Sequence, residues 1–418
     1  MAELNHTNVA AIFNTIYPDG VESIVMPVSP MVGIIGKDIK AWNGLGGNGK
    51  SLVWEYGGAN GASGDYAVSA AQYGNEQIAR LTITRGRLFA HRRISHEDWE
   101  ATDGNNTAAV GLMKQAVDGA MRQLKKRVGT LLNGGPVGAI GRIAVGSGVT
   151  TAAITLSNPS QAKNFQNSQR LQVLNGSTYA LRAASVVTLT STGVNLETGV
   201  LTASAHWDDT VAGVADGDYL IPEGDLGQVP TTMDQWNPPT LITAADSWFG
   251  ISRNSSIEMQ GCRYAATAGS LDEVLVRAAA YHSDLGGEAD ICFANPIDVA
   301  TLKSDLHKVQ VHATNSQGRE IASVSYDAVV VKGPAGDIQV FSDPYRPRGW
   351  PRLTKRDSWK IWTLGEMFRR LTKGTGGDGL QKVADADASL MAFGGYWQLV
   401  CERPIDSCII SIPGAATI

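Results

Sequence analysis

The stretch from residue 106 to residue 132 carries apolar side chains at steps of three and four, with charged side chains on its other faces. The apolar positions are Val110, Met113, Val117, Met121, Leu124, Val128 and Leu131. This is the period of an amphipathic helix, and Asn106 or Thr107 can cap its start. At 1.5 Å per residue the predicted helix is about 40 Å long, which suits the spine of a flat, elongated domain.

Side chains alternate with a period of two, as in a β-strand, in two runs before this helix. The first extends from Leu52 to Tyr56 and the second from Arg80 to Arg85. A long stretch of small residues separates the two runs, so they predict an extended β-hairpin over Leu52–Arg93. Its ends carry Arg80, Arg85, Arg87, Arg92 and Arg93. A two-stranded hairpin with so few apolar residues is marginal alone, and we expect it to lie against something else.

Helical periodicity is lost from about Gly138 to Asp225. Short alternating runs replace it: Arg142–Val145, Ala153–Leu156, Leu171–Leu174, Val186–Thr190 and Val200–Ala203. The sequence NLETG, which ends at Gly199, predicts a tight turn before the last run. This pattern and a lower density of lysine and arginine predict a separate β-barrel or sandwich, although the strands could instead extend the main sheet.

Helices return with a capping box at Ser270–Glu273 and a stop at Gly286. Ile291–Ala294 reads as a buried strand, after which Asn295 caps a second helix with Pro296 at its first position. Further strands are predicted at Val309–His312, Ala328–Val331, Ile338–Phe341, Trp359–Thr363, Tyr396–Cys401 and Ser407–Ile412. Helices on a mostly antiparallel sheet make the fold class α+β.

Length and composition set broad limits. The 418 residues, 43% apolar and 18% charged, indicate a globular, β-rich chain of two or three domains. A formal charge of −5 gives no general attraction to nucleic acid or membrane. We expect no signal peptide and no transmembrane segment. The four cysteines form no C-x-x-C pair and read as reduced thiols of a protein made in a cytoplasm.

The stretch GLGGNGKS, from Gly44 to Ser51, fits the phosphate-binding pattern G-x-x-x-x-G-K-[ST]. That cradle needs a buried strand before the loop and a helix that opens at the Lys-Ser end. The run before it, Gly36–Asn43, is too polar for a buried parallel strand, and the run after Ser51 has a strand period. We therefore predict a glycine-rich turn that leads into a strand, and no nucleotide site.

Histidines offer the remaining candidates for metal or acid–base chemistry. His91 and His96 lie five residues apart in a charged segment, and His307 and His312 have the same spacing. Both pairs are better explained as surface positions than as metal ligands. No nucleophile elbow, H-E-x-x-H motif or zinc cysteine pair is present in the sequence. We predict no catalytic residue, no metal site and no cofactor.

The segment Asp343–Lys373 has nine lysines and arginines against three carboxylates, a net charge of +6. Its interleaved aromatic residues are Tyr345, Trp350, Trp359 and Trp362. Basic and aromatic residues together are typical of single-stranded nucleic acid binding. The alternative, which we favour, is a surface between subunits that meets acidic neighbours while the aromatic residues lie in the core.

The order of these elements resembles the major capsid protein of tailed double-stranded DNA bacteriophages, which has the Hong Kong 97-type capsid fold. The resembling segments are Gly111–Gly135, Ala289–Lys303, Asp327–Leu371 and Gly395–Pro413. The β-rich segment, with VTLTSTGVNLETGVLTASAHW and GDYLIPEGD, looks like the insertion domain that some members carry. No single segment is a diagnostic motif, because this family is united by shape more than by sequence.

The resemblance implies a domain plan. Its parts are an N-terminal arm (1–45), an extended hairpin loop (46–102), the spine helix of a peripheral domain (103–137), the inserted β-domain (138–227), a connection (228–269), an axial domain (270–340) and the remainder with a closing strand (341–418). The short arm implies separate scaffolding. Lys50 is the only lysine between Lys40 and Lys114 and lies at the hairpin base, which disfavours the covalent crosslinking of some relatives.

The resemblance also implies a function. The chain would assemble with itself into hexamers and pentamers of an icosahedral virion shell around double-stranded DNA, built in a bacterial cytoplasm. Portal and scaffolding proteins, and optionally a decoration protein, would be its partners, with no membrane contact. The residues expected at assembly interfaces are Trp54, Arg80, Arg85, Arg87, Arg92, Arg93, Arg346 and Arg348. The alternative is a cytoplasmic multidomain hydrolase or glycan-active enzyme with an appended β-domain.

Overall fold

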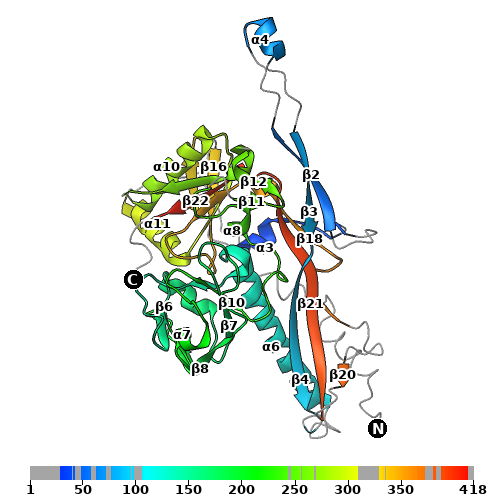
Figure 1. The fold of residues 1–418 in the computed structure, drawn as a ribbon. Helices are drawn as coiled ribbons and strands as arrows, with labels where there is room; N and C mark the ends of the chain where they lie inside the picture. The colour runs from blue at the N-terminus through cyan, green and yellow to red at the C-terminus, as the bar shows by residue number, and fades with distance from the viewer. Residues whose placement is uncertain are drawn as a thin grey trace.

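The computed structural model describes residues 29–39, 41–42, 49–57, 63–71, 77–95, 97, 106–242, 246–255, 257–267, 270–308, 329–334, 336–371, 380–382 and 387–412. Within these ranges the fold is α+β, with three six-stranded sheets and two two-stranded ones. Figure 1 shows a long ribbon of strands beside one long helix, with two more compact units on the other side of the helix. The elements far apart in sequence meet along the long ribbon.

The first sheet is organised around β21 (Ala388–Cys401), the longest strand described. Along one stretch it pairs antiparallel with β4 (Gly86–Ser95), and near its end with β18 (Trp359–Thr363). The other members are β1 (Gly36–Asp38), β19 (Arg369–Arg370) and β20 (Leu380–Lys382). The polar run before GLGGNGKS holds a short edge strand that pairs parallel with β18, and none of its three residues is buried, so the buried strand that a phosphate cradle needs is not formed there.

Helix α6 (Asn106–Leu132) has the predicted bounds and lies along β4. Its stripe is buried from Val117 to Leu131, in one core with Leu88, Ala90 and Ile94 of β4. Side chains on β4 alternate between buried and exposed, so a single face of the strand meets the helix. Burying each large apolar side chain of the stripe contributes roughly 1.5–3 kcal/mol, which holds the helix on the ribbon.

The predicted hairpin is shorter than expected. Strand β2 (Gly49–Gly57) pairs with β3 (Gln77–Thr84), and the short helix α4 (Tyr66–Ala71) lies between them in sequence. The run that follows Arg85 leaves the hairpin and becomes β4, where it pairs with β21 instead. The arginines from Arg87 onward are therefore in the sheet of the body. We call residues 49–84 the arm.

The β-rich segment forms a sheet of its own. Its strand order is β5 (Gly141–Arg142), β10 (Tyr219–Pro222), β7 (Arg170–Leu174), β8 (Val187–Val194), β9 (Val200–Ala203) and β6 (Ala153–Thr155). The core beneath it comes from the same segment and includes Leu171, Leu201 and Trp207. The NLETG turn forms as predicted, with Gly199 at φ +70, where the left-handed backbone favours glycine. Strand β10 was not among the predicted strands.

A third sheet has the order β13 (Cys262–Ala265), β22 (Ser407–Ser411), β17 (Arg352–Thr354), β14 (Ile291–Ala294), β16 (Gly336–Ser342) and β15 (Val329–Gly333). Helices α10 (Leu271–Asp284) and α11 (Pro296–Lys308) pack on it. Asn295 caps α11 as predicted, since its Oδ1 accepts from the Ile297 N–H at 3.0 Å. Ser270 is the N-cap of α10, but its side chain makes no capping hydrogen bond, so the predicted capping box is absent.

The remaining elements are short. They are α3 (Pro30–Ile34), α7 (Trp207–Thr210), α8 (Met233–Trp236), α9 (Ile257–Gln260), β11 (Ser247–Trp248), β12 (Ile251–Ser252) and the 3-10 turns η2 (Pro136–Gly138), η3 (Pro159–Asn164), η4 (Arg253–Ser255), η5 (Arg356–Ser358) and η6 (Pro404–Asp406). No described helix is long and apolar enough to cross a membrane. The predicted strand Val309–His312 falls outside the described residues.

Asp343 ties three distant segments together. Its carboxylate accepts hydrogen bonds from the Ser29 hydroxyl, from Asn133 Nδ2 at 3.0 Å and from the Tyr345 N–H at 2.9 Å. Ser29 comes from the N-terminal segment and Asn133 follows the end of α6. Next to this point the Tyr345 ring lies against α6, where a Cβ on Gly129 would come within 2.2 Å of it. Only glycine permits that approach.

A second buried cluster, nine residues further on, joins the sheets. Arg352 is fully buried and donates to the Asp234 carboxylate on α8, to Ser407 Oγ at 3.0 Å and to the Asn237 carbonyl at 3.2 Å. Arg346 shares the same carboxylate at 3.4 Å. Burial lowers the pKa of Arg352 to about 9, although Asp234 opposes that shift. The guanidinium is retained inside the protein only because carbonyl and carboxylate oxygens surround it.

The β-rich unit has its own sheet and core, and we predict that residues 138–227 fold alone. The expected result for the isolated segment is a cooperative thermal transition and dispersed β-type amide signals, since about 90 residues suffice for a small, marginally stable domain. A disordered isolated segment whose amides are nevertheless protected in the full chain would show that its strands depend on the main fold.

The buried carboxyl of Asp343 should make stability depend on pH. Burial raises its pKa above the ordinary value, with the hydrogen bonds from Ser29 and Asn133 opposing. The contribution of the protonated Asp343 carboxyl to folding stability is then fully present below its pKa in the unfolded state, about 3.9. It is lost as the pH rises through its pKa in the folded state. Asp343→Asn cannot titrate. As the pH rises, the free energy of unfolding of the wild type should fall relative to that of the variant, by about 1.4 kcal/mol for each unit by which folding raises the pKa of Asp343.

Urea denaturation at a series of pH values from 4 to 8 measures this difference. The exposed Asp357, on η5 in the same segment, offers the matched control, because Asp357→Asn should keep the pH slope of the wild type. Parallel stability curves for wild type and Asp343→Asn would contradict the prediction.

Candidate assembly surfaces

The arm is the element with the least support from its own chain. Its base is anchored, because Leu81 and Ile83 are fully buried in the core of the first sheet. Towards the tip, α4 has no buried residue, and Tyr66 is 90% exposed. Asp65 caps this helix through its Oδ1, which accepts from the Ala67 N–H at 2.8 Å. Figure 1 shows α4 at the far end of the arm, well away from the rest of the chain.

The structure spreads the residues expected at interfaces over the strands β2, β3 and β4 and the loop that follows β16. Trp54 lies on β2 of the arm, opposite Ala79 in register, and Arg80 is exposed on β3. Arg85 is half-buried at the junction of β3 and β4. Three of the expected residues lie on β4, where successive side chains point to opposite faces of the strand. Arg87 and Arg93 are exposed, whereas Arg92 is half-buried on the side towards α6.

Arg346 and Arg348 have roles inside the chain. Arg346 is 1% exposed and contacts Asp234, and its Nε donates to the Trp350 carbonyl at 2.5 Å, so its expected place at a subunit interface is corrected. Sequence pattern cannot distinguish a buried cation from an exposed one. Arg348 joins the β-rich unit instead: its N–H donates to Ser160 Oγ at 3.2 Å and its carbonyl accepts from Asn158 Nδ2 at 3.0 Å.

Two further cations and two tryptophans of the basic segment Asp343–Lys373 are also engaged within the chain. Trp359 and Trp362 are buried, so they offer no surface on which bases could stack. Lys355 pairs with Glu288, and Lys360 pairs with Glu402 at 2.6 Å. Trp359 and Trp362 lie in the core as we favoured, whereas Tyr345 and Trp350 are half-buried.

A different basic surface follows from the packing of α6 on β4. A groove of about 760 Å³ lies between these elements, the turn η3 and the residues Pro344 and Tyr345. The cations along it are Arg92, Arg122, Lys125, Lys126 and Lys163, and a smaller adjoining hollow adds Arg93. Among the residues that the structure describes, no carboxylate lines either space. We call these six residues and their surroundings the basic groove.

The charges of the basic groove are compensated mainly at Lys163, where Asp343 and Asp298 oppose the effect of burial on the pKa. Among the described residues none of its six cations forms an ion pair, and the Arg92 Nε atom is buried without a hydrogen-bond partner. Lys126 Nζ donates to the Phe165 carbonyl at 2.7 Å. Burial lowers the pKa of Lys126 and of Lys163, because both ammonium groups have lost water. An anionic group placed in the basic groove would be attracted more strongly than at an open surface, because water screens the charges less there.

Only part of this groove was accessible to sequence reasoning. Arg92 and Arg93 were expected at an interface, but the helix cations were read as the charged faces of an amphipathic helix. Lys163 lies in the β-rich unit, and its approach to α6 depends on the docking of that unit. The available signal was the cluster at steps of three and four from Arg122 to Lys126, which places its cations near one face of the helix.

The motif GLGGNGKS has a structural role at its described end. Gly49, Lys50 and Ser51 open β2, so the Lys-Ser end begins a strand, as expected, and no helix N-terminus is available for a phosphate. Lys50 Nζ lies 4.4 Å from the centre of the Trp362 ring and 3.9 Å from the Asp38 carboxylate. These contacts fasten the base of the arm to the first sheet.

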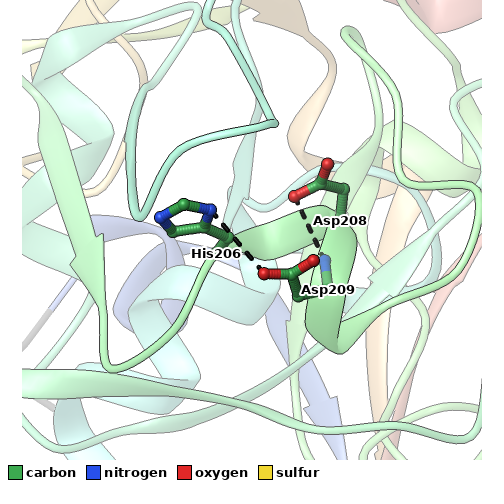
Figure 2. A group of neighbouring side chains, drawn as sticks. All are labelled: His206, Asp208 and Asp209. Atoms are coloured by element: carbon green, nitrogen blue, oxygen red, sulfur yellow. Dashed lines mark hydrogen bonds and ion pairs between the residues drawn. The ribbon is translucent and has the colours of Figure 1, made fainter.

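Three side chains of the β-rich unit could together contact a cation. Figure 2 shows His206, Asp208 and Asp209 at the start of α7. His206 Nδ1 is 3.7 Å from an oxygen of Asp209, and Asp208 Oδ1 accepts from the Asp209 N–H at 3.1 Å. All three are exposed. Two acids in the first turn of a helix are explained by the helix dipole, so this cluster carries no functional proposal.

The other described histidines have ordinary surroundings. His282 is buried, and its Nε2 lies 2.7 Å from the Ile405 carbonyl, with burial lowering its pKa. His91 is exposed on β4. His96, His307 and His312 fall outside the residues whose side chains are described. The described histidines therefore provide no nucleophile–base arrangement.

No family model and no curated protein matches this chain. Several solved structures share its general course. A cyanophage A-1(L) capsid chain is 13% identical with a TM-score of 0.47, and the alignment covers 92% of each chain. The capsid of a native GTA particle is 10% identical with a TM-score of 0.42, covering 90% of this chain and 91% of that one. At such values we base the functional proposal on the chain's own geometry.

A satellite phage P4 procapsid chain is a third similar structure. It is 9% identical with a TM-score of 0.36, and the alignment covers 93% of this chain and 96% of that chain.

Proposed function

We propose that this chain is the structural subunit of an icosahedral phage shell, assembling into hexamers and pentamers around double-stranded DNA. The observation that carries the proposal is the arm: a two-stranded ribbon whose terminal helix is exposed and whose described residues are buried only near its base. Such an element is stable and useful only when it lies on another molecule. In a closed shell every subunit provides that partner to its neighbour.

The arrangement of the other elements supports the same function. In this proposal α6 is the spine helix of a peripheral domain built on β21 and β4, and the sheet of β14 and β22 with α10 and α11 is the axial domain. The sheet formed by β5 to β10 is then an inserted domain, clamped to α6 by the Arg127–Asp225 ion pair. Strand β13, which precedes residue 270, belongs to the axial sheet, so we place the start of that domain earlier than expected.

The partners and location follow from this function. Portal and scaffolding proteins would start and shape the assembly, a decoration protein could bind outside it, and the site of assembly would be the bacterial cytoplasm. The enzyme alternative is not favoured by any described constellation. Electron microscopy of the purified protein tests the proposal directly: shells, rings or sheets are expected, and discrete small particles would oppose it.

We further propose that the basic groove receives an acidic surface of a neighbouring copy. The arm is the part of the chain that fits, because between Lys50 and Arg80 it carries Glu55, Asp65 and Glu76 and no cation. Opposite charges on two surfaces of one chain favour association between copies and fix its register. Packaged DNA is the other anion that a shell would present to such a groove.

The exposed tip of the arm should be needed for assembly. Tyr66→Ala is expected to leave the melting temperature of the unassembled subunit unchanged and to raise the critical concentration for assembly about tenfold, the effect of losing one contact of about 1.4 kcal/mol. Sedimentation velocity measures this concentration. Val145→Ala, at an equally exposed position of the β-rich unit, is the matched control. Equal critical concentrations for both variants would oppose a role of the arm.

Reversal of charge tests the basic groove. Arg122→Glu should weaken assembly by tenfold or more at low salt, since a like charge then faces the acidic neighbour. Combining it with Glu55→Lys and Glu76→Lys on the arm should restore part of the loss. If Arg122→Glu assembles normally but its shells retain less DNA, the groove contacts DNA instead.

A further inference from the structure

Two buried cysteines lie side by side on neighbouring strands of the third sheet. Cys262 on β13 and Cys408 on β22 are direct partners in a parallel pair, and their sulfur atoms are 2.7 Å apart. Both are at most 1% exposed. Neighbouring strands are about 4.8 Å apart, which lies within the range of Cα separations that a disulfide bridges. Cys292 and Cys401, which are equally buried, have no such partner among the described residues.

We propose that Cys262 and Cys408 are a covalent modification site, at which a peroxide-class oxidant converts the two thiols into an intrachain disulfide. In the first step one thiol and the peroxide give a sulfenic acid and water. In the second step the neighbouring thiol attacks that sulfur, the S–S bond forms and a second water leaves. The two sulfur atoms are oxidised and the peroxide oxygens are reduced. This inference does not depend on the proposed function.

The position of the pair determines when and to what effect it reacts. Burial raises the pKa of Cys408 well above its usual range, so the thiol stays protonated and reacts slowly in the folded chain. Among the described strands, β13 is the edge of its sheet and pairs with β22 alone. A bond between residues 146 apart would fasten this edge and remove conformational freedom from the unfolded chain. The oxidised protein should therefore be harder to unfold than the reduced protein.

The experiment treats the full chain with hydrogen peroxide, blocks the remaining thiols under denaturing conditions and maps the peptides without reduction. We expect one linked peptide that joins the segments of Cys262 and Cys408, a monomer on non-reducing gels, and a melting temperature raised by a few degrees that dithiothreitol reverses. Cys262→Ser should abolish the linkage and the shift. Cys292→Ser, at a buried position of the same sheet, should keep both.

Other outcomes overturn the proposal. Sulfinic acid at residues 262 and 408 with no linked peptide would show that the thiols oxidise independently. A linked peptide found only in a covalent dimer would assign the bond to two chains. If Cys262→Ser fails to fold, the peptide map of the wild type still decides, because it alone reports whether the two segments are joined.

Discussion

The placement of every large unit depends on polar contacts of the ten residues from Asp343 to Arg352, made by buried side chains at Asp343 and Arg352 and by the backbone at Arg348. The Asp343 carboxylate holds the N-terminal segment and the end of α6, and Arg352 holds α8 and the closing strand β22. Between them, Arg348 holds the β-rich unit. Removal of one partner of such a buried pair leaves an uncompensated charge and costs about 3–5 kcal/mol. Apolar packing stabilises each unit, whereas this segment fixes the orientation of the units relative to one another.

There is a physical reason why apolar packing stabilises each unit while polar contacts orient the units. The three large cores are built from largely different sets of residues, so apolar burial would tolerate several relative placements. Hydrogen bonds to a buried carboxylate or guanidinium are directional and are expensive to leave unmade. The loop therefore selects one arrangement. The basic groove is a product of that selection, because Lys163 reaches it from the β-rich unit and Arg92 from β4.

Local pattern predicted the elements whose environment is set by near neighbours in the sequence. The stripe of α6, the Asn295 cap and the bounds of β18 are confirmed, since each depends on residues a few positions apart. Pairing across the chain was less accessible: β4 was assigned to a hairpin because its partner β21 lies some 300 residues away. Arg346 was placed at an interface, and the groove was found only in part, because burial and convergence arise from tertiary packing.

The junction between the arm and the body has a mechanical consequence. Strand β3 ends at Thr84 and β4 begins at Gly86, so Arg85 alone separates a ribbon that projects outward from a strand held along its whole length by β21. On the body side the backbone is clamped, since the Arg87 N–H donates to the Gln228 carbonyl at 2.8 Å. On the arm side Leu81 and Ile83 are buried in the same core, so the base of the arm is held as firmly as the body. Bending is left to the part of the ribbon beyond them, towards the exposed α4, where a small change of angle would carry the tip to a different neighbour without repacking the interior.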